Sequence, residues 1–337
     1  MKRLLEKVFA REHLTRQEAQ QMAEKMFEGE MTDSQIAAFL TALKCKGETA
    51  EEMAGIAETI QGKAVKITCD AHNVMDNCGT GGDQSGSFNI STTAAFVLAA
   101  GGVTVAKHGN RSISSKSGSA DIFECLGLDL SLLPAKLSTL LNEVGLAFLF
   151  APHMHPKMNY VMKVRKELGT PTILNLIGPL TNPVTLESQL MGTYRRDLLE
   201  ETAKTLGGLG RKRAIVVNGS GGMDEASLAG TTHFALLENS TISMHEIRPE
   251  EFGFTRLPLS AIRGGTAEQN TEILLSILKN QVSPYLDTVL LNAGLGFFSN
   301  GKVSTVKEGI SLAKECVSSG AAFDKLQQLI RMQKEVA

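Results

Sequence analysis

The sequence has few features of the kinds that mark secreted or membrane-spanning proteins. An odd, scattered set of cysteines without a CxxC pair argues against a disulfide framework or a zinc knuckle and fits a reducing compartment. The longest apolar run, residues 94–105, is too short to span a bilayer. The N-terminus has no apolar segment followed by a small-residue cleavage site. We therefore expect a cytoplasmic protein that does not bind membranes. The cysteines are Cys45, Cys69, Cys78, Cys125 and Cys316.

The chain also lacks an excess of charge of either sign. Lysine and arginine total 34, aspartate and glutamate total 36, and the net charge of the 337 residues is −2. A nearly neutral protein has no general field that attracts phosphate backbones, which argues against a nucleic-acid partner. Hydrophobic residues form 42% and charged residues 21% of the chain. This balance is typical of a globular protein and excludes disorder as the main state.

Three segments near the N-terminus begin with the pattern Thr-x-x-Glu or Thr-x-x-Gln, at Thr15, Thr32 and Thr49. In such a capping box, the threonine hydroxyl and the side chain three positions later satisfy backbone amides at the start of a helix. Apolar residues then recur every three or four positions, which is the spacing of one helix face. We expect residues 1–70 to form a small α-helical domain, joined by helices from about 157–187.

From about residue 70, short apolar runs alternate with helical patterns. This alternation predicts an α/β domain, residues 71–156 and 188–337, with a mainly parallel central sheet flanked by helices. Strands are expected at 74–76, 103–107, 146–150 and 215–217, and a hairpin at 234–247. Helices are expected at 91–100, 120–126 and 198–206, and three more close the chain at 266–280, 305–318 and 322–334.

The common nucleotide, zinc-protease and hydrolase motifs are absent, because no Walker A, GxGxxG, HExxH or GxSxG pattern occurs. Three other loops suit anions. Residues 79–83, GTGGD, offer an anion-binding nest of backbone amides or a tight structural turn. Residues 89–93, NISTT, either cap a helix or face a phosphate. Residues 107–112, KHGNRS, follow a strand and lead into a serine-rich run to Ser119, which either wraps a pyrophosphate or is a solvated loop.

Two further motifs contain ionisable side chains. Asp224 and Glu225 follow two glycines, and adjacent carboxylates suit an oxygen-seeking ion such as Mg²⁺, although such pairs are more often surface charge. Arg165 either grips a carboxylate in bidentate fashion or lies on a helix surface. No general base is evident, and His108 is the nearest candidate.

In their order, and over essentially the whole chain, these motifs resemble those of the anthranilate phosphoribosyltransferases. The motifs are GTGGD, NIST, KHGNRS, SGSAD, VRKELG, GPLTNP and MDE. The resemblance implies the type III phosphoribosyltransferase fold, shared with pyrimidine nucleoside phosphorylases. It implies transfer of the phosphoribosyl group of phosphoribosyl pyrophosphate (PRPP) to the amine of anthranilate, giving N-(5-phosphoribosyl)anthranilate and pyrophosphate. This is the second step of tryptophan biosynthesis from chorismate.

The same resemblance implies roles for individual residues. Metal would be held by Ser91, Asp224 and Glu225, with two Mg²⁺ ions per monomer, and anthranilate by Gly79, Asn110 and Arg165. A homodimer through the helical domain is implied, and an association with anthranilate synthase is left open. Gln84 departs from the family, in which glycine is common after GTGGD. The residues implied to bind PRPP are Gly79, Gly82, Asp83, Ser87, Asn89, Ile90, Ser91, Thr92, Lys107, His108, Gly109, Asn110, Arg111, Ser112, Ile113, Ser114, Ser115 and Ser119.

Two alternatives remain at this point. A pyrimidine nucleoside phosphorylase would share the fold, but it needs a further C-terminal domain and lacks the KHGNRS loop. A non-catalytic, nucleic-acid-binding relative should be basic and should have lost the metal acids, whereas this chain has a net charge of −2 and keeps Asp224 and Glu225.

Overall fold

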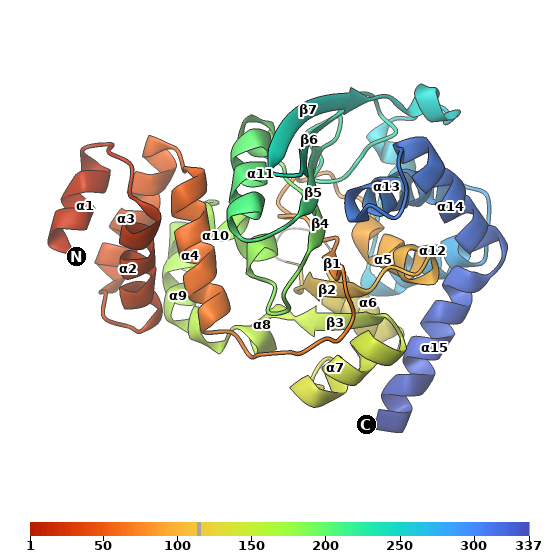
Figure 1. Cartoon of the computed structure of the whole chain (residues 1–337), viewed down its shortest axis with the longest axis horizontal. Helices are drawn as coiled ribbons and strands as arrows, with labels where there is room; N and C mark the ends of the chain where they lie inside the picture. The colour runs from red at the N-terminus through yellow and green to blue at the C-terminus, as the bar shows by residue number, and fades with distance from the viewer. Residues whose placement is uncertain (113–115, 337) are drawn as a thin grey trace.

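The computed structural model of the chain describes residues 1–112 and 116–336. Its N-terminal part is a bundle of helices at one end of the molecule (Figure 1). The three expected capping boxes, at Thr15, Thr32 and Thr49, are all formed. The expected N-terminal helices are therefore confirmed. They are α2 (Arg16–Phe27), α3 (Asp33–Lys46) and α4 (Ala50–Gly62), and a further helix, α1 (Lys2–Phe9), precedes them.

Two short helices from the middle of the chain, α9 (Asn159–Leu168) and α10 (Ile173–Leu176), lie beside this bundle (Figure 1). Lys163 Nζ of α9 lies 2.5 Å from Asp33 Oδ2 at the start of α3. Lys44 Nζ donates to Thr170 Oγ1 at 2.7 Å. Segments more than a hundred residues apart in the chain are thus joined by charged and polar contacts as well as by apolar packing.

The described residues form one seven-stranded sheet in the order β3-β2-β1-β4-β5-β6-β7. Neighbouring strands from β3 to β5 are parallel, whereas β6 is antiparallel to both of its neighbours, β5 and β7. The expected mainly parallel sheet is confirmed, although β4 had no counterpart among the expected strands. The strands are β1 (Met75–Asp76), β2 (Val105–Gly109), β3 (Leu146–Phe150), β4 (Ser188–Gly192), β5 (Arg213–Asn218), β6 (Thr232–Glu238) and β7 (Thr241–Ile247).

Helices cover both faces of this sheet. The expected helices in the α/β part are confirmed within a few residues. They are α5 (Ile90–Ala100), α6 (Ser119–Cys125), α11 (Leu199–Gly208), α12 (Ala267–Leu278), α14 (Val306–Ser318) and α15 (Ala321–Val336). Helices α7 (Pro134–Glu143) and α8 (Ala151–Met154) flank β3, and five 3-10 helices complete the described elements. These are η1 (Pro156–Met158), η2 (Gly178–Thr181), η3 (Arg196–Leu198), η4 (Pro249–Phe252) and η5 (Leu259–Ile262).

The expectation of only three closing helices is wrong, because a long helix, α13 (Pro284–Asn300), lies between α12 and α14. Most of its residues are buried, so it lacks the one-sided apolar pattern by which a surface helix is recognised. Its glycines allow close packing. A Cβ on Gly294 would lie 2.5 Å from Ile310 of α14, and one on Gly296 would lie 2.8 Å from Leu98 of α5.

Alternate side chains of β5 enter two different apolar cores. Ile215 and Val217 pack with α5 and α12–α15, whereas Ala214 and Val216 pack with α11 and the N-terminal bundle. The loops that follow the carboxyl ends of the central parallel strands meet at one edge of the sheet. No helix among the described residues is long and apolar enough to cross a membrane.

Candidate active site

The GTGGD loop lies at the carboxyl end of β1 and packs against the loop after β5. The Thr80 amide donates to the Gly192 carbonyl at 2.9 Å, and the Gly81 amide donates to Asp224 Oδ2 at 2.7 Å. A Cβ on Gly79 would collide with that same carboxylate oxygen. Only glycine fits there, so this loop is shaped to hold Asp224 in place.

Gln84, which follows the GTGGD motif, has a backbone conformation that is typical of glycine. Gln84 has φ +56°, a left-handed conformation that glycine adopts without strain and other residues adopt at a cost. The loop therefore keeps the conformation that glycine favours although this chain has glutamine.

Three carboxyl groups come together beside this loop. Burial, followed by repulsion from Asp83, raises the pKa of Asp224 to about 7. Burial, followed by repulsion from Asp224, raises the pKa of Glu225 to about 8, while a hydrogen bond from Ser91 opposes the rise. Asp83 Oδ2 is buried and has no hydrogen-bond partner in the described part of the chain. Such a cluster is electrostatically unfavourable unless protons or a cation neutralise it.

This donor set fits Mg²⁺, which prefers carboxylate and hydroxyl oxygens and usually keeps several waters. The structure brings Ser91, Asp224 and Glu225 together, as the sequence predicted for a metal site, and adds Asp83. Among the described residues, no group of three or more His, Cys, Asp or Glu side chains is arranged so that it could hold a metal ion by itself. The arrangement is therefore an open site that water or an anionic ligand would complete.

The N-terminus of α5 faces the same edge of the sheet. Its first turn is not capped by the Asn89 side chain. Instead, Asn89 Oδ1 accepts from Asn270 Nδ2 at 2.9 Å, and Asn89 Nδ2 donates to the Ser117 carbonyl at 3.3 Å. Thr92 Oγ1 donates to Ser119 Oγ at 2.9 Å. The start of the helix is thus tied to the polar loop, and its positive end favours an anion.

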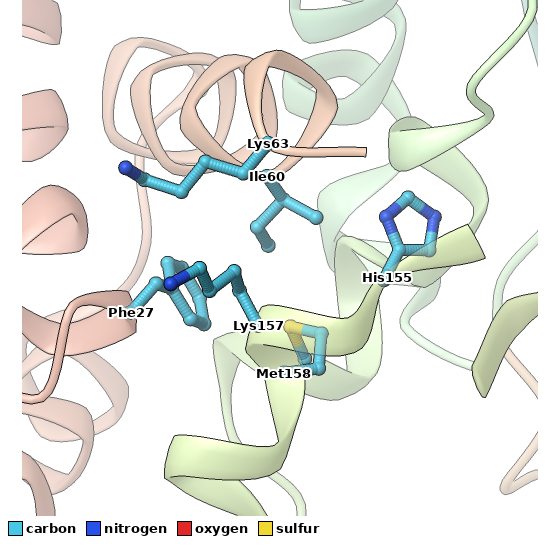
Figure 2. A pocket seen from close by; sticks show the side chains of 6 residues that line it. All are labelled: Phe27, Ile60, Lys63, His155, Lys157 and Met158. Carbon is cyan, nitrogen blue, oxygen red and sulfur yellow. The ribbon is translucent and has the colours of Figure 1, made fainter. Parts of the chain in front are cut away.

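Strand β2 places Lys107 and His108 at this edge, and both are buried. His108 Nε2 lies 3.2 Å from His155 Nε2. Burial lowers the pKa of both imidazoles, that of His155 to about 4. Both rings are therefore neutral at pH 7, and one must donate to the other. His155 also lines a small pocket, together with Phe27, Ile60, Lys63, Lys157 and Met158 (Figure 2).

The other basic residues of the predicted site differ in their partners. Arg111 forms ion pairs with Asp121 at 2.8 Å and Glu124 at 2.6 Å, both on α6, and these pairs raise its pKa. Arg165 Nη1 contacts Met162 Sδ at 3.8 Å, and burial lowers the pKa of the Arg165 guanidinium. No ion pair to Arg165 is found within residues 1–112 and 116–336, so its charge is available to an anionic ligand.

The remaining predicted residues have varied positions. Gly82 has φ +80° and lies in the GTGGD loop, while Ile90 is buried in the first turn of α5. Ser87 pairs with Arg263 in an isolated bridge, and Asn110 Oδ1 accepts from the Arg111 amide. Gly109 ends β2, and Ser112 is the last described residue before the gap. Ile113, Ser114 and Ser115 lie outside the described residues.

Sequence reasoning missed several buried polar residues that support this edge. Asp76 and Asn182 bond to each other and to β2. Asn270 bonds to Asn89 and Ser117, and Asn292 bonds to both backbone groups of Ala226, next to Glu225. For Asn270 and Asn292 the available signal was a polar residue inside an apolar helical pattern, and that signal does not reveal the partner.

Comparisons with known proteins place the whole chain in one group. Residues 2–64 match the helical bundle domain of a glycosyl transferase family, and residues 71–323 match its a/b domain. An anthranilate phosphoribosyltransferase of Listeria monocytogenes serovar 1/2a is 62% identical, covering 100% of this chain and 99% of that protein.

Solved structures agree. The anthranilate phosphoribosyltransferase of Thermus thermophilus is 38% identical with a TM-score of 0.94, covering 98% of this chain and 99% of that one. The Saccharomyces cerevisiae enzyme in complex with PRPP and Mg is 27% identical with a TM-score of 0.89, covering 98% and 97%.

Proposed function

The chain belongs to the anthranilate phosphoribosyltransferase family, and from this we infer which of its residues bind each substrate. The enzyme transfers the phosphoribosyl group of PRPP to the amine of anthranilate and releases pyrophosphate. This is the second step of tryptophan biosynthesis. The assignments below rest on the geometry of the sheet edge and on the chemistry that PRPP, a polyanion, demands.

We propose that PRPP binds between the GTGGD loop, the start of α5 and the end of β2. Backbone amides of the loop, the positive end of α5 and the ammonium of Lys107 all favour phosphate oxygens. Arg111 is held by two carboxylates of α6, so its part in PRPP binding requires that it exchange these partners or act through its backbone. The other residues that the resemblance implies for PRPP binding remain part of this proposal.

We propose that Ser91, Asp224 and Glu225 hold Mg²⁺, with two ions per monomer. The raised pKa values of Asp224 and Glu225 and the unpartnered oxygen of Asp83 support a cation there. Bound Mg²⁺ supplies positive charge that stabilises the departing pyrophosphate.

Anthranilate is assigned to Arg165, Asn110 and Gly79. A partly buried guanidinium that has no carboxylate partner among the described residues can bind an incoming carboxylate in bidentate fashion. Arg165 would therefore bind the anthranilate carboxylate, and Asn110 and the backbone at Gly79 would orient the amine toward the ribose.

The chemistry needs little covalent participation by the protein. The bond from C1′ of ribose to pyrophosphate breaks, the amine nitrogen bonds to C1′, and the nitrogen then loses a proton. The ammonium of Lys107 would stabilise the charge that develops on the leaving group. The aromatic amine is already neutral at pH 7, so positioning matters more than deprotonation. His108 stays a candidate to accept the amine proton, although burial lowers its pKa well below the usual value and so weakens it as a base.

The observation that supports this assignment best is the cluster of Asp83, Asp224 and Glu225 beside Lys107. We would test it with the double variant Asp224→Asn, Glu225→Gln, following the loss of anthranilate fluorescence with PRPP and Mg²⁺. We expect turnover to fall by at least about a hundredfold, since both charges that hold the ion are lost. Glu315→Gln, at an exposed site on α14, serves as the control.

Unchanged activity in the double variant would mean that the metal is held elsewhere. Phosphorolysis of thymidine or uridine, measured in parallel, is expected to be absent.

The assembly and the domains are further proposals. We propose a homodimer through the helical bundle, supported by exposed Phe9 of α1 and by Tyr160 and Met162 of α9. Light scattering of the purified protein tests this. Domain boundaries of 1–70 with 157–187, and of 71–156 with 188–337, a cytoplasmic location and an association with anthranilate synthase stay predictions.

A further inference from the structure

The GPLTNP segment, residues 178–183, has no role in the function proposed above. It nevertheless contacts strands β1 and β2, whose carboxyl ends lead into the site. Its Asn182 is buried and donates through Nδ2 to Asp76 Oδ2 at 2.9 Å and to the Ala106 carbonyl at 2.8 Å. Asn182 Oδ1 accepts from the Val184 amide at 3.0 Å. Each polar atom of this side chain is therefore engaged, and its orientation is fixed.

Asp76, the last residue of β1, is fully buried. Besides the bond from Asn182, its Oδ1 accepts from the His108 amide at 3.3 Å, and its Oδ2 accepts from Cys78 Sγ at 3.2 Å. A buried carboxylate is expensive unless donors or a positive charge compensate it. Here the compensating donors are the Asn182 side-chain amide, the Cys78 thiol and the His108 backbone amide.

These contacts bracket one residue. Asn182 holds the carbonyl of Ala106 and Asp76 holds the amide of His108, and the residue between them is Lys107. The Lys107 side chain is 1% exposed, and its Nζ lies 3.4 Å from the Asn77 carbonyl, a long contact. Burial raises the pKa of Asp76, and the positive charge of Lys107 opposes the rise. Lys107 therefore favours the ionised form of this carboxyl group, against the effect of burial.

We propose that Asp76 and Asn182 are positioning residues that hold Lys107 at the place where the leaving pyrophosphate develops charge. This rests on the role proposed above for Lys107. The pair fixes the backbone on both sides of the lysine, through the Ala106 carbonyl and the His108 amide. Neither residue touches a substrate.

The test compares Asn182→Ala and Asp76→Asn with a matched control, Asn300→Ala. Asn300 is also buried and bonds to the Asn73 carbonyl and Ser188 Oγ, at the amino ends of β1 and β4, away from the site. We expect both pair variants to lose roughly tenfold to a hundredfold in kcat, as small misplacements of catalytic groups do. The KM for anthranilate should change little. The control should lose thermal stability to a similar extent and keep its kcat.

A double-mutant cycle with Lys107→Gln separates this inference from the function on which it rests. If Lys107→Gln leaves kcat unchanged, the proposed role of Lys107 fails. If Lys107→Gln lowers kcat and Asn182→Ala adds little to it, the pair acts through the lysine. If the two losses multiply in full, or if Asn182→Ala keeps kcat while losing stability like the control, the positioning role is overturned. Asp76→Asn supplies a second cycle should Asn182→Ala fail to fold.

Discussion

Replacement of Glu225 by glutamine is expected to stabilise the metal-free protein, and to do so more strongly as the pH rises. Glu225 lies beside Asp224 and near Asp83, and burial together with the repulsion of these carboxylates raises its pKa to about 8. In an unfolded chain a glutamate ionises near pH 4.3. The folded protein therefore holds a proton over a pH range in which the unfolded chain has released it.

The sign of the effect follows from this difference. Below about pH 4 both states are protonated, and Glu225 does not affect the free energy of unfolding. Between that pH and about 8, each pH unit lowers the free energy of unfolding by up to about 1.4 kcal/mol. Glutamine does not titrate, so the variant avoids this loss. Between pH 5.5 and 7.5 its advantage should grow by up to about 3 kcal/mol, with coupling to Asp224 lowering that figure.

Thermal unfolding of the wild-type protein and of Glu225→Gln in a metal chelator would measure this, at several pH values from 5.5 to 7.5. Glu315→Gln controls for the removal of a charge at an exposed position. Saturating Mg²⁺ should restore the wild type far more than the variant, because the variant has lost a ligand. A difference in melting temperature that does not change with pH, or one that the Glu315 variant shares, would refute the claim that Glu225 is held in an unfavourable field.

Three other substitutions test separate parts of the site. Arg165→Ala should raise the KM for anthranilate by roughly tenfold to a hundredfold through loss of a charge-assisted pair, and an equal rise in the KM for PRPP would remove Arg165 from its proposed role. Gly79→Ala should abolish Mg²⁺-dependent turnover in a protein that still folds, because its Cβ would collide with Asp224 Oδ2; normal kinetics would show that the loop yields. Gln84→Gly should raise the free energy of unfolding by up to about 1 kcal/mol through relief of the left-handed backbone, and a lower melting temperature would mean that the Gln84 side chain is itself stabilising.

The parts of this fold that local chemistry determines could be predicted from the sequence. The capping boxes at Thr15, Thr32 and Thr49 are each closed within four residues, so a short window of sequence contains all the information. Helix α13 was missed because its position depends on burial among α5, α14 and the sheet, and such a helix has no polar face. Strand β4 was missed for a different reason: it is as buried as β3, but its sequence SQLMG begins with two polar residues and ends in glycine, so it forms neither an apolar run nor an alternating pattern.

The same distinction between local sequence and tertiary contacts applies to the residues of the site. The loops after β1, β2 and β5 could be identified because glycines, cations and adjacent acids are unusual in sequence, and parallel strands bring such loops to one edge. Asp76, Asn182 and Asn270 could not, since each acts through a bond to a residue at least thirty positions away. Their residue types are common, and only the fold reveals what they contact.

The contacts around the loop after β5 explain how a destabilising cluster of carboxyl groups is retained. Asp224 and Glu225 repel each other in the folded chain, and a flexible loop would relieve that repulsion by letting them separate. Here the Gly81 amide binds Asp224, the Asn292 side chain binds both backbone groups of Ala226, and a Cβ on Gly192 would collide with the Asp224 carbonyl. Hydrogen bonds from uncharged groups and close packing therefore keep the two carboxyl groups together despite their repulsion. None of these groups adds a positive charge that would repel a cation. A site built this way binds a divalent ion with its ligands already oriented, so the ion offsets the repulsion on binding instead of having to order the loop.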